Sequence, residues 1–481
     1  ARLVPARSAA GEASSGAEGA DGGGAAAAWR AVQRAFLPAN VTSDYWEYAR
    51  WRCCQRVASS MLNVLATQQM LYAIGIGAER GLAAAAVVNW VLKDGLGRLG
   101  KLAVSTRLGS SFDADLKQYR FSSSVVYNVA HALEFTTALV PQHFLVLATV
   151  ANIGKSIGVS TSMSITPAIH RSFAMSENMA DVSAKNQAQQ VVADNVGLAL
   201  AVGLSKWWAH VSPSKAAVTL MPFAAYPVLA GLDMFCIRNE LRAVALRTLN
   251  VTRAELAADE WLRRGGGAGG GGAAGGAHTR GAVGGDRGSG GRMWRWLSGG
   301  GDGGGGGGKR KLSSVPVAAP TAREVALVEP VMPGRRPGER VLRLSVGALP
   351  VAHMRFEAEL RAVAEDARDC GSALVAHVDP RTGERTASLV LGEGAVSSAH
   401  AVLRGVLEAA HLRRALGEQD AAGKRVSGHE AAMDNMRRLQ KESKLFADKH
   451  TSELMEALVA AGWNTTHFKL SETQASYVTC A

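Results

Sequence analysis

Long runs of residues without a charged side chain constrain this chain more than any other feature of its sequence. Residues 57–78 and 135–154 contain no Asp, Glu, Lys or Arg, and residues 216–232 are uncharged and mostly apolar despite two prolines. About 20 mainly apolar residues cross a bilayer as an α-helix, so the first two runs have the length of a membrane span and the third is borderline. We therefore predict a mainly α, multi-helix domain that is embedded in a membrane.

A large soluble helical bundle is the alternative fold for this region, because helices that are buried on every side are also apolar all round. Polar residues inside the runs, such as Asn63, Gln68 and Asn152, are compatible with that alternative. The spacing of Gly154 and Gly158 lets two membrane helices approach closely, and it favours the membrane interpretation.

Composition divides the chain into four regions: 1–35, 36–262, 263–325 and 326–481. Residues 1–35 are rich in Ala and Gly, and we expect a disordered segment with the composition of a transit-peptide remnant. Residues 36–262 hold the apolar runs and form the helical membrane domain. More than half of residues 264–308 are glycine, which predicts a flexible, disordered linker or insertion.

The C-terminal region, 326–481, has the pattern of a small α+β domain. Residues 340–346, 373–378 and 386–391 are predicted strands, and the turn residues 379–384 separate the second strand from the third. An amphipathic helix is expected over 397–416, and a long charged helix over 427–461 ends at Gly462.

Charge and cysteine usage exclude several classes of site. The net charge is +12, but only 6% of the residues are aromatic and the basic residues are scattered, so we expect no nucleic-acid partner. The five cysteines show no paired metal-ligand spacing, and we predict neither a zinc site nor a disulfide framework. The sequence also lacks the HExxH, Walker A and GxSxG motifs, and we predict no catalytic residues.

Charged and polar residues close to the apolar runs are the candidates for a ligand site or a polar path. A charged group inside a bilayer is costly unless it is paired or faces a polar cavity, which makes such residues functional candidates. Helix ends at the membrane interface and an ordinary solvated face are the alternatives. The candidates are Lys93, Asp94, Arg98, Asp113, Asp115, Lys117, Arg120, Asp181, Lys185 and Asn195.

Four glycines in the same part of the chain, Gly95, Gly97, Gly100 and Gly109, are predicted to allow close helix packing. The first three also satisfy the spacing G-x-G-x-x-G. A dinucleotide site needs that motif inside a βαβ unit, and no further alternation of strands and helices follows.

Six segments, in this order along the chain, resemble the root UV-B sensitive family. They are Phe36-Leu37-Pro38, Val64-Leu65-Ala66-Thr67-Gln68, Asn89-Trp90-Val91-Leu92-Lys93-Asp94-Gly95, Gly109-Ser110-Ser111-Phe112-Asp113-Ala114-Asp115, Ala180-Asp181-Val182-Ser183-Ala184-Lys185 and Leu246-Arg247-Thr248-Leu249-Asn250. The resemblance covers residues 36–262 and returns weakly at Ala460-Ala461-Gly462-Trp463.

The resemblance implies a non-enzymatic, membrane-associated protein that is linked to the UV-B response and to vitamin B6 homeostasis. It implies family paralogues as hetero-oligomer partners and a plastid membrane, or another organelle membrane, as the location. Pyridoxal phosphate is the cofactor that the family association points to, and the small-molecule ligand is otherwise unidentified.

Two other functions stay open. A membrane transporter is the first, because six apolar segments resemble half of a major-facilitator carrier. A pyridoxal-phosphate-binding protein is the second, with Lys93, Lys155 or Lys185 as the residue that would form a Schiff base.

Overall fold

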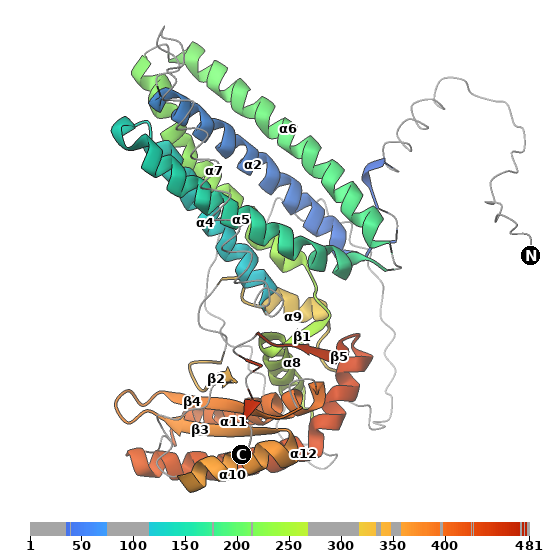
Figure 1. The fold of residues 1–481 in the computed structure, drawn as a ribbon. Coiled ribbons are helices and arrows are strands. Elements are labelled where there is room, and N and C mark those ends of the chain that lie inside the picture. Colours follow the sequence, from blue (N-terminus) through green and yellow to red (C-terminus); the bar gives the residue numbers. More distant parts are fainter. Residues whose placement is uncertain are drawn as a thin grey trace, which may run out of the picture.

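A computed structural model describes residues 35–38, 40–74, 115–175, 178–212, 215–267, 317–332, 338–347, 357–394, 398–424, 426, 428–471, 474–475 and 477–478. Long helices form an elongated bundle, and a smaller α+β unit lies at one end of it (Figure 1). The described part of the chain is thus mostly helical with a small sheet region near its C-terminal end, as the sequence predicts. The bundle consists of α2 (Asp44–Ala73), α4 (Leu116–Thr136), η2 (Pro141–His143), α5 (Phe144–Phe173), α6 (Met179–Val211) and α7 (Lys215–Ala243).

The uncharged run 135–154 does not form a single helix, so the sequence prediction of one span there is wrong. α4 ends at Thr136, and α5 begins only at Phe144. Pro141, which has no backbone N–H and cannot extend a helical hydrogen-bond ladder, starts the short 3-10 turn η2 between them. The run therefore closes a hairpin of two antiparallel helices.

Glycines set the closest approaches between the helices. A Cβ atom at Gly158 of α5 would lie 3.0 Å from the carbonyl oxygen of Ser123 on α4. A Cβ at Gly197 of α6 would lie 2.6 Å from the carbonyl oxygen of Val57 on α2. Larger side chains would force these helix pairs apart, so the predicted packing role is confirmed for Gly158.

Large apolar side chains cover the outside of the bundle. On α6, Val191, Leu198 and Leu200 are each about half exposed, and on α5 and α7 Met163 and Val228 are exposed further still. Two described helical segments, Pro141–Phe173 and Leu220–Ala243, are long and apolar enough to cross a membrane. In each of them only 33% of the most apolar window is buried inside the protein.

The α+β unit is built around a small mixed sheet. In this sheet β4 (Arg385–Gly392) pairs in parallel with β2 (Arg343–Val346), antiparallel with β3 (Ser372–Val378) and in parallel with β6 (Tyr477–Val478). The sheet is covered by the helices α10 (Glu357–Cys370), α11 (Ala399–Ala421) and α12 (His429–Ala460) (Figure 1). Asp379 accepts backbone hydrogen bonds in the turn between β3 and β4, where the sequence predicts a turn. A further strand, β5 (Asn464–Lys469), follows α12.

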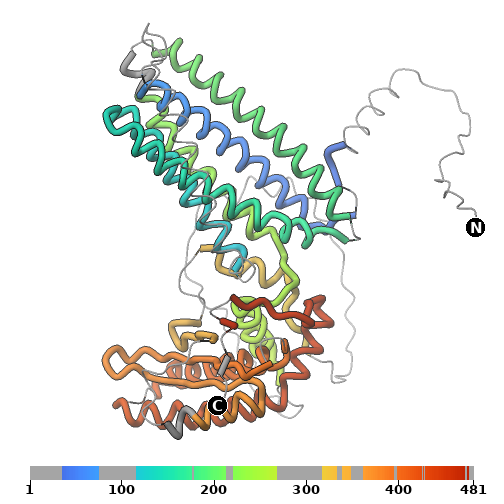
Figure 2. Tube along the Cα trace, in the orientation of Figure 1, coloured from blue at the N-terminus to red at the C-terminus, as the bar shows by residue number. Residues whose placement is uncertain are grey.

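The sequence does not reveal that α8 and the C-terminal tail pack together. β1 (Thr248–Asn250) pairs in parallel with β5, which brings two distant parts of the chain side by side (Figure 2). α8 (Val251–Arg263) follows β1 and buries Trp261 in the same hydrophobic core as α11 and α12. The core of the α+β unit therefore includes residues on both sides of the predicted boundary at 262.

A short helix, α9 (Ala322–Val328), lies between the bundle and the α+β unit (Figure 1). Thr321 and Glu324 form a capping box at its first turn, which satisfies two of the free backbone N–H groups there. Glu329 follows its last turn and is buried. The linker segment 268–316 and most of residues 1–35 lie outside the described residues, so their predicted disorder stays a prediction.

Candidate functional site

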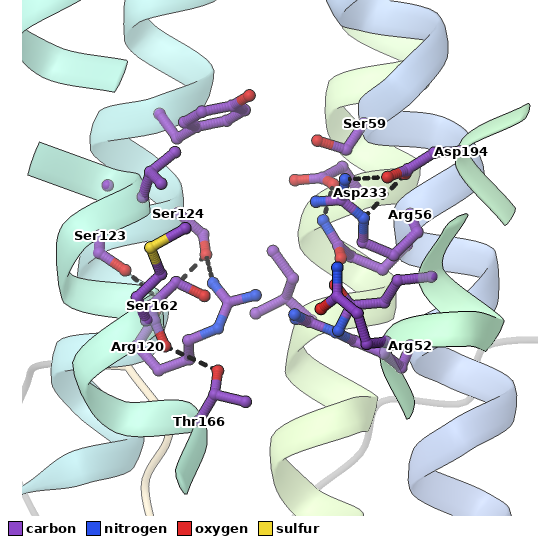
Figure 3. Close-up of a pocket in the computed structure, with 18 of the residues that line it drawn as sticks. Arg52, Arg56, Ser59, Arg120, Ser123, Ser124, Ser162, Thr166, Asp194 and Asp233 are labelled. Carbon is purple, nitrogen blue, oxygen red and sulfur yellow. Dashed lines mark hydrogen bonds and ion pairs between the residues drawn. The ribbon is translucent and has the colours of Figure 1, made fainter. Parts of the chain in front are cut away.

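A polar cavity of about 530 Å³ lies inside the bundle, between α2, α4, α5, α6 and α7 (Figure 3). Its walls carry three arginines and two aspartates together with several serine, threonine and glutamine side chains. Polar groups thus gather in the interior of a bundle whose outer surface is apolar. A cavity of this size is large enough for a small organic molecule.

Two of the three arginines are held by carboxylates. Arg52 of α2 lies 3.2 Å from Glu240 of α7, and both side chains are buried. Arg56 of α2 donates two hydrogen bonds, of 2.9 and 2.6 Å, to the two carboxylate oxygens of Asp194 on α6. These pairs connect α2 to α7 and to α6, and they place two neutralised guanidinium groups along one wall.

Arg120 of α4 is the third arginine, and it projects from the opposite wall toward the α2 side (Figure 3). Its side chain is buried, and its guanidinium donates a hydrogen bond to the hydroxyl of Ser124, one turn further along α4. Among the described residues, no carboxylate lies within ion-pair distance of Arg120. Burial lowers the pKa of Arg120, and the nearby charge of Glu240 opposes this shift. A buried guanidinium without an ion-pair partner is a favourable site for an anionic ligand group.

Asp233 of α7 lines the same cavity and is also buried. One carboxylate oxygen accepts a 2.7 Å hydrogen bond from the side-chain amide of Gln55, and the other accepts one of 2.7 Å from Asn128. Burial raises the pKa of Asp233, whereas the hydrogen bonds from Asn128 and Gln55 act to lower it. A cationic ligand group beside the carboxylate would favour its ionised form. Within the described part of the chain, no cation forms an ion pair with Asp233.

A second cluster of buried charges continues along α4. Glu134 lies 3.1 Å from the ammonium group of Lys155 on α5 and 3.3 Å from the ring of His131. Lys155 also donates a 2.8 Å hydrogen bond to the side-chain amide oxygen of Asn63 on α2. Tyr127, which lines the cavity, packs its ring edge to face on His131, and so links the two polar clusters.

The structure separates the candidate residues that the sequence grouped together. Arg120 reaches the cavity, whereas Lys117 lies at the junction with the α+β unit, where its ammonium group is 2.8 Å from Glu329. Asp115 is also near that junction and accepts a 3.2 Å hydrogen bond from Asn250. The candidates outside the described residues are Lys93, Asp94, Gly95, Gly97, Arg98, Gly100, Gly109 and Asp113.

The candidates on α6 do not reach the cavity. Asp181 and Lys185 are 2.9 Å apart and form the i, i+4 pair that their spacing predicts. The amide of Asn195 donates a 2.8 Å hydrogen bond to the backbone carbonyl of Val191 at an exposed position. A polar path through these three residues stays a prediction.

Glu329 connects the bundle to the rest of the protein. Its carboxylate lies 2.8 Å from Lys117 of α4 and 2.9 Å from Arg253 of α8, and all three side chains are buried. Burial by itself would raise the pKa of Glu329, but the charges of Arg253 and Lys117 hold it below its usual value. The carboxylate is therefore ionised at neutral pH and holds α4, α8 and the end of α9 together.

Asp233 in the cavity and Glu240 behind its wall are not predicted from the sequence, because their signal is weak in isolation. Asp233 and Glu240 follow the apolar run of α7 and stand seven positions apart, which places them on one face of a helix. Two carboxylates on one helix face, close to a long apolar run, indicate buried partners. Their partners on α2, Gln55 and Arg52, cannot be paired with them from spacing alone, because α2 and α7 are distant in sequence.

Comparison with known proteins assigns the chain to a family. The family model described as the vitamin B6 photo-protection and homoeostasis domain matches residues 24–265, which is half of the chain. Protein root UVB sensitive 4 of Arabidopsis thaliana is 44% identical over 227 residues, covering 47% of this chain and 43% of that relative. RUS family member 1 of Dictyostelium discoideum is 31% identical over 230 residues, covering 47% of this chain and 42% of the relative.

The protein named root UVB sensitive 2, chloroplastic, of Arabidopsis thaliana is 29% identical over 228 residues, which cover 47% of this chain and 50% of the relative. The matched regions thus span half, or slightly less than half, of the length of these curated relatives. No solved structure matches it. The matched region contains the complete helical bundle, its cavity and α8. The chain therefore belongs to the root UV-B sensitive family, whose vitamin B6 photo-protection and homoeostasis domain covers residues 24–265.

Proposed function

We propose that the helical bundle is embedded in a membrane and binds a vitamin B6 vitamer in its polar cavity, without catalysing a reaction. The strongest support for the membrane location is that charged side chains lie inside the bundle and apolar side chains cover its surface. Buried charges such as Arg52, Arg120 and Glu240 lie inside the bundle, while half-exposed Val and Leu side chains cover its surface. Water favours the opposite arrangement, whereas a lipid environment favours this one.

Pyridoxal 5′-phosphate is the first candidate ligand, because the family domain is named for vitamin B6. Its phosphate group fits the anion site at Arg120, where the hydroxyls of Ser123, Ser124 and Ser162 also line the cavity. The fit is non-covalent: no lysine lines the cavity in the described part of the chain, and Lys155 is paired with Glu134. When bound, the vitamer supplies a reactive aldehyde, and the cavity walls would keep that aldehyde away from water and other amines.

Location and partners follow from the same relationship. We propose a plastid membrane, because one relative of this chain is named chloroplastic. Family paralogues are the proposed hetero-oligomer partners, and the apolar outer faces of α5 and α6 offer surfaces for a second membrane protein as well as for lipid.

Replacing Arg120 tests the proposed ligand site. We expect the purified full chain in mild detergent to bind pyridoxal 5′-phosphate, and Arg120→Gln to weaken that binding about 10- to 100-fold. A charge-assisted hydrogen bond to phosphate contributes about 1.5 to 3 kcal/mol, which corresponds to this range. Isothermal titration calorimetry measures both affinities.

Arg437→Gln is the matched control, because Arg437 is exposed on α12, far along the chain from the cavity. Its affinity for the vitamer should equal that of the wild-type chain. Wild-type protein that does not bind pyridoxal 5′-phosphate, or an Arg120→Gln variant with unchanged affinity, would contradict the proposed function.

A transporter is the second candidate function. The buried charge pairs on α2, α4, α5 and α7 favour it, because ionisable groups inside a membrane bundle commonly mark a substrate or ion path. In this function the cavity holds a substrate in transit. Uptake of labelled vitamer into proteoliposomes distinguishes the two candidates: a binding protein gives saturable binding without accumulation inside the vesicle.

A further inference from the structure

We propose that the cavity selects a zwitterion: Arg120 binds the anionic group of the ligand, and Asp233 binds a protonated amino group. This inference rests on the proposed function, because it assumes that the cavity is the ligand site. It narrows that function by naming the preferred chemical class of the ligand, a small molecule with a phosphate or carboxylate at one end and an ammonium group at the other. Pyridoxamine 5′-phosphate is the vitamer of this class, whereas pyridoxal 5′-phosphate carries an aldehyde in place of the amine and would be bound through its phosphate at Arg120.

The balance of charges inside the cavity supports this proposal. Four charged lining residues besides Arg120 are present, and two of them, Arg56 and Asp194, neutralise one another in a bidentate pair. Arg52 is neutralised by Glu240 from behind the wall. One guanidinium, that of Arg120, and one carboxylate, that of Asp233, remain outside any ion pair among the described residues.

The positions of Arg120 and Asp233 on different walls of the cavity also support it. Arg120 projects from α4 on one side of the cavity, and Asp233 lies on α7 on the side that carries Arg56 and Ser59 (Figure 3). Neither group reaches the other to form an ion pair. A ligand that carries one charge of each sign can satisfy both, whereas a simple anion leaves the buried carboxylate without a cation.

Neighbouring side chains hold the charged groups of Arg120 and Asp233 in fixed positions. Gln55 and Asn128 hold the two oxygens of Asp233 from opposite helices, α2 and α4, and Ser124 holds the guanidinium of Arg120. Each carboxylate oxygen keeps a free lone pair for another donor. Groups that are held before the ligand arrives lose little conformational entropy on binding, which favours discrimination between similar ligands.

Two vitamers that differ in a single group provide the test. Pyridoxamine 5′-phosphate and pyridoxine 5′-phosphate share the ring and the phosphate, but the first has an aminomethyl group where the second has a hydroxymethyl group. We expect the wild-type full chain to bind the amine about tenfold or more tightly than the alcohol in calorimetry. In Asp233→Asn the ratio of the two affinities should fall to about one, whereas Arg120→Gln should weaken both ligands.

The affinity ratio is measured on one protein at a time, so it does not depend on equal stability of the variants. Equal affinities of the wild-type chain for the two vitamers would overturn the zwitterion proposal while leaving the proposed vitamer site intact. An unchanged ratio in Asp233→Asn would also overturn it. If the wild-type chain binds neither vitamer, the proposed function itself fails. Should Asp233→Asn not fold, the wild-type ratio alone decides.

Discussion

Glu329→Gln is expected to lower the free energy of unfolding by about 3 to 5 kcal/mol. The substitution keeps the size of the side chain but removes the negative charge that lies 2.8 Å from Lys117 and 2.9 Å from Arg253. The guanidinium of Arg253 would then be buried without a counter-charge, and breaking a buried ion pair from one side has this large effect. Burial already lowers the pKa of Lys117, and the substitution removes the carboxylate that favours its charged form. Chemical denaturation of the full chain in mild detergent, followed by tryptophan fluorescence, measures the change.

The same variant has a characteristic pH dependence. The folded-state pKa of Glu329 is lowered from the ordinary value of 4.5, so its stabilising contribution is complete above that pH. The contribution is lost as the pH falls through the lower, folded-state pKa, because protonation then removes the charge. Glu329→Gln should show no such loss. Glu418→Gln, at an exposed position of α11, is the control and should change stability by less than about 0.5 kcal/mol.

Arg52→Met is the second change with a large expected effect, again about 3 to 5 kcal/mol of lost stability. It leaves the carboxylate of Glu240 buried on α7 with no ion-pair partner among the described residues. The double variant Arg52→Met with Glu240→Leu should recover most of that loss, because an apolar pair avoids the cost of keeping charges out of water. Thermal and chemical unfolding of the four proteins form a double-mutant cycle.

An exposed pair on α12, Arg438 and Glu442, provides the reference for this cycle. Both side chains are more than half exposed, so Arg438→Met should change the stability by less than about 1 kcal/mol. If Arg52→Met proves as mild as Arg438→Met, the charge pair between α2 and α7 is not buried as the structure shows.

Local patterns in the sequence predict much of the fold. The apolar runs locate the helices of the bundle, and the turn residues after β3 locate the hairpin to β4. Pro141 marks the break between α4 and α5, although the run on both sides of it contains no charged residue. A proline is visible in the local sequence, whereas a uniformly uncharged run does not show where one helix ends and the next begins.

Contacts between residues that are distant in the sequence determine the features of the fold and site that the sequence does not predict. Lys117 and Arg120 are three positions apart on α4, yet one binds Glu329 at the junction and the other faces the cavity. Which of them faces the cavity is set by tertiary packing, because Glu329, the residue that binds Lys117, is distant in sequence. The parallel pairing of β1 with β5 has the same cause, since a three-residue strand has no pattern of its own.

The junction at Glu329 also gives the two parts of the protein a physical connection. α4 lines the cavity with Arg120 and begins next to Lys117, one helical turn away. α8 shares the core of the α+β unit and carries Arg253. A change in the position of α9 would therefore act on both α4 and α8.

Extraction of the full chain from cell membranes tests the central claim most directly, namely that the apolar outer face of the bundle lies in lipid. The chain should stay with the membrane fraction after washing with about 1 M salt and after washing with alkaline carbonate. Both treatments weaken electrostatic attachment to the membrane surface, but neither removes apolar protein surface from lipid. Mild detergent should then solubilise it. Release into the soluble fraction by salt or carbonate alone would contradict a membrane-embedded bundle.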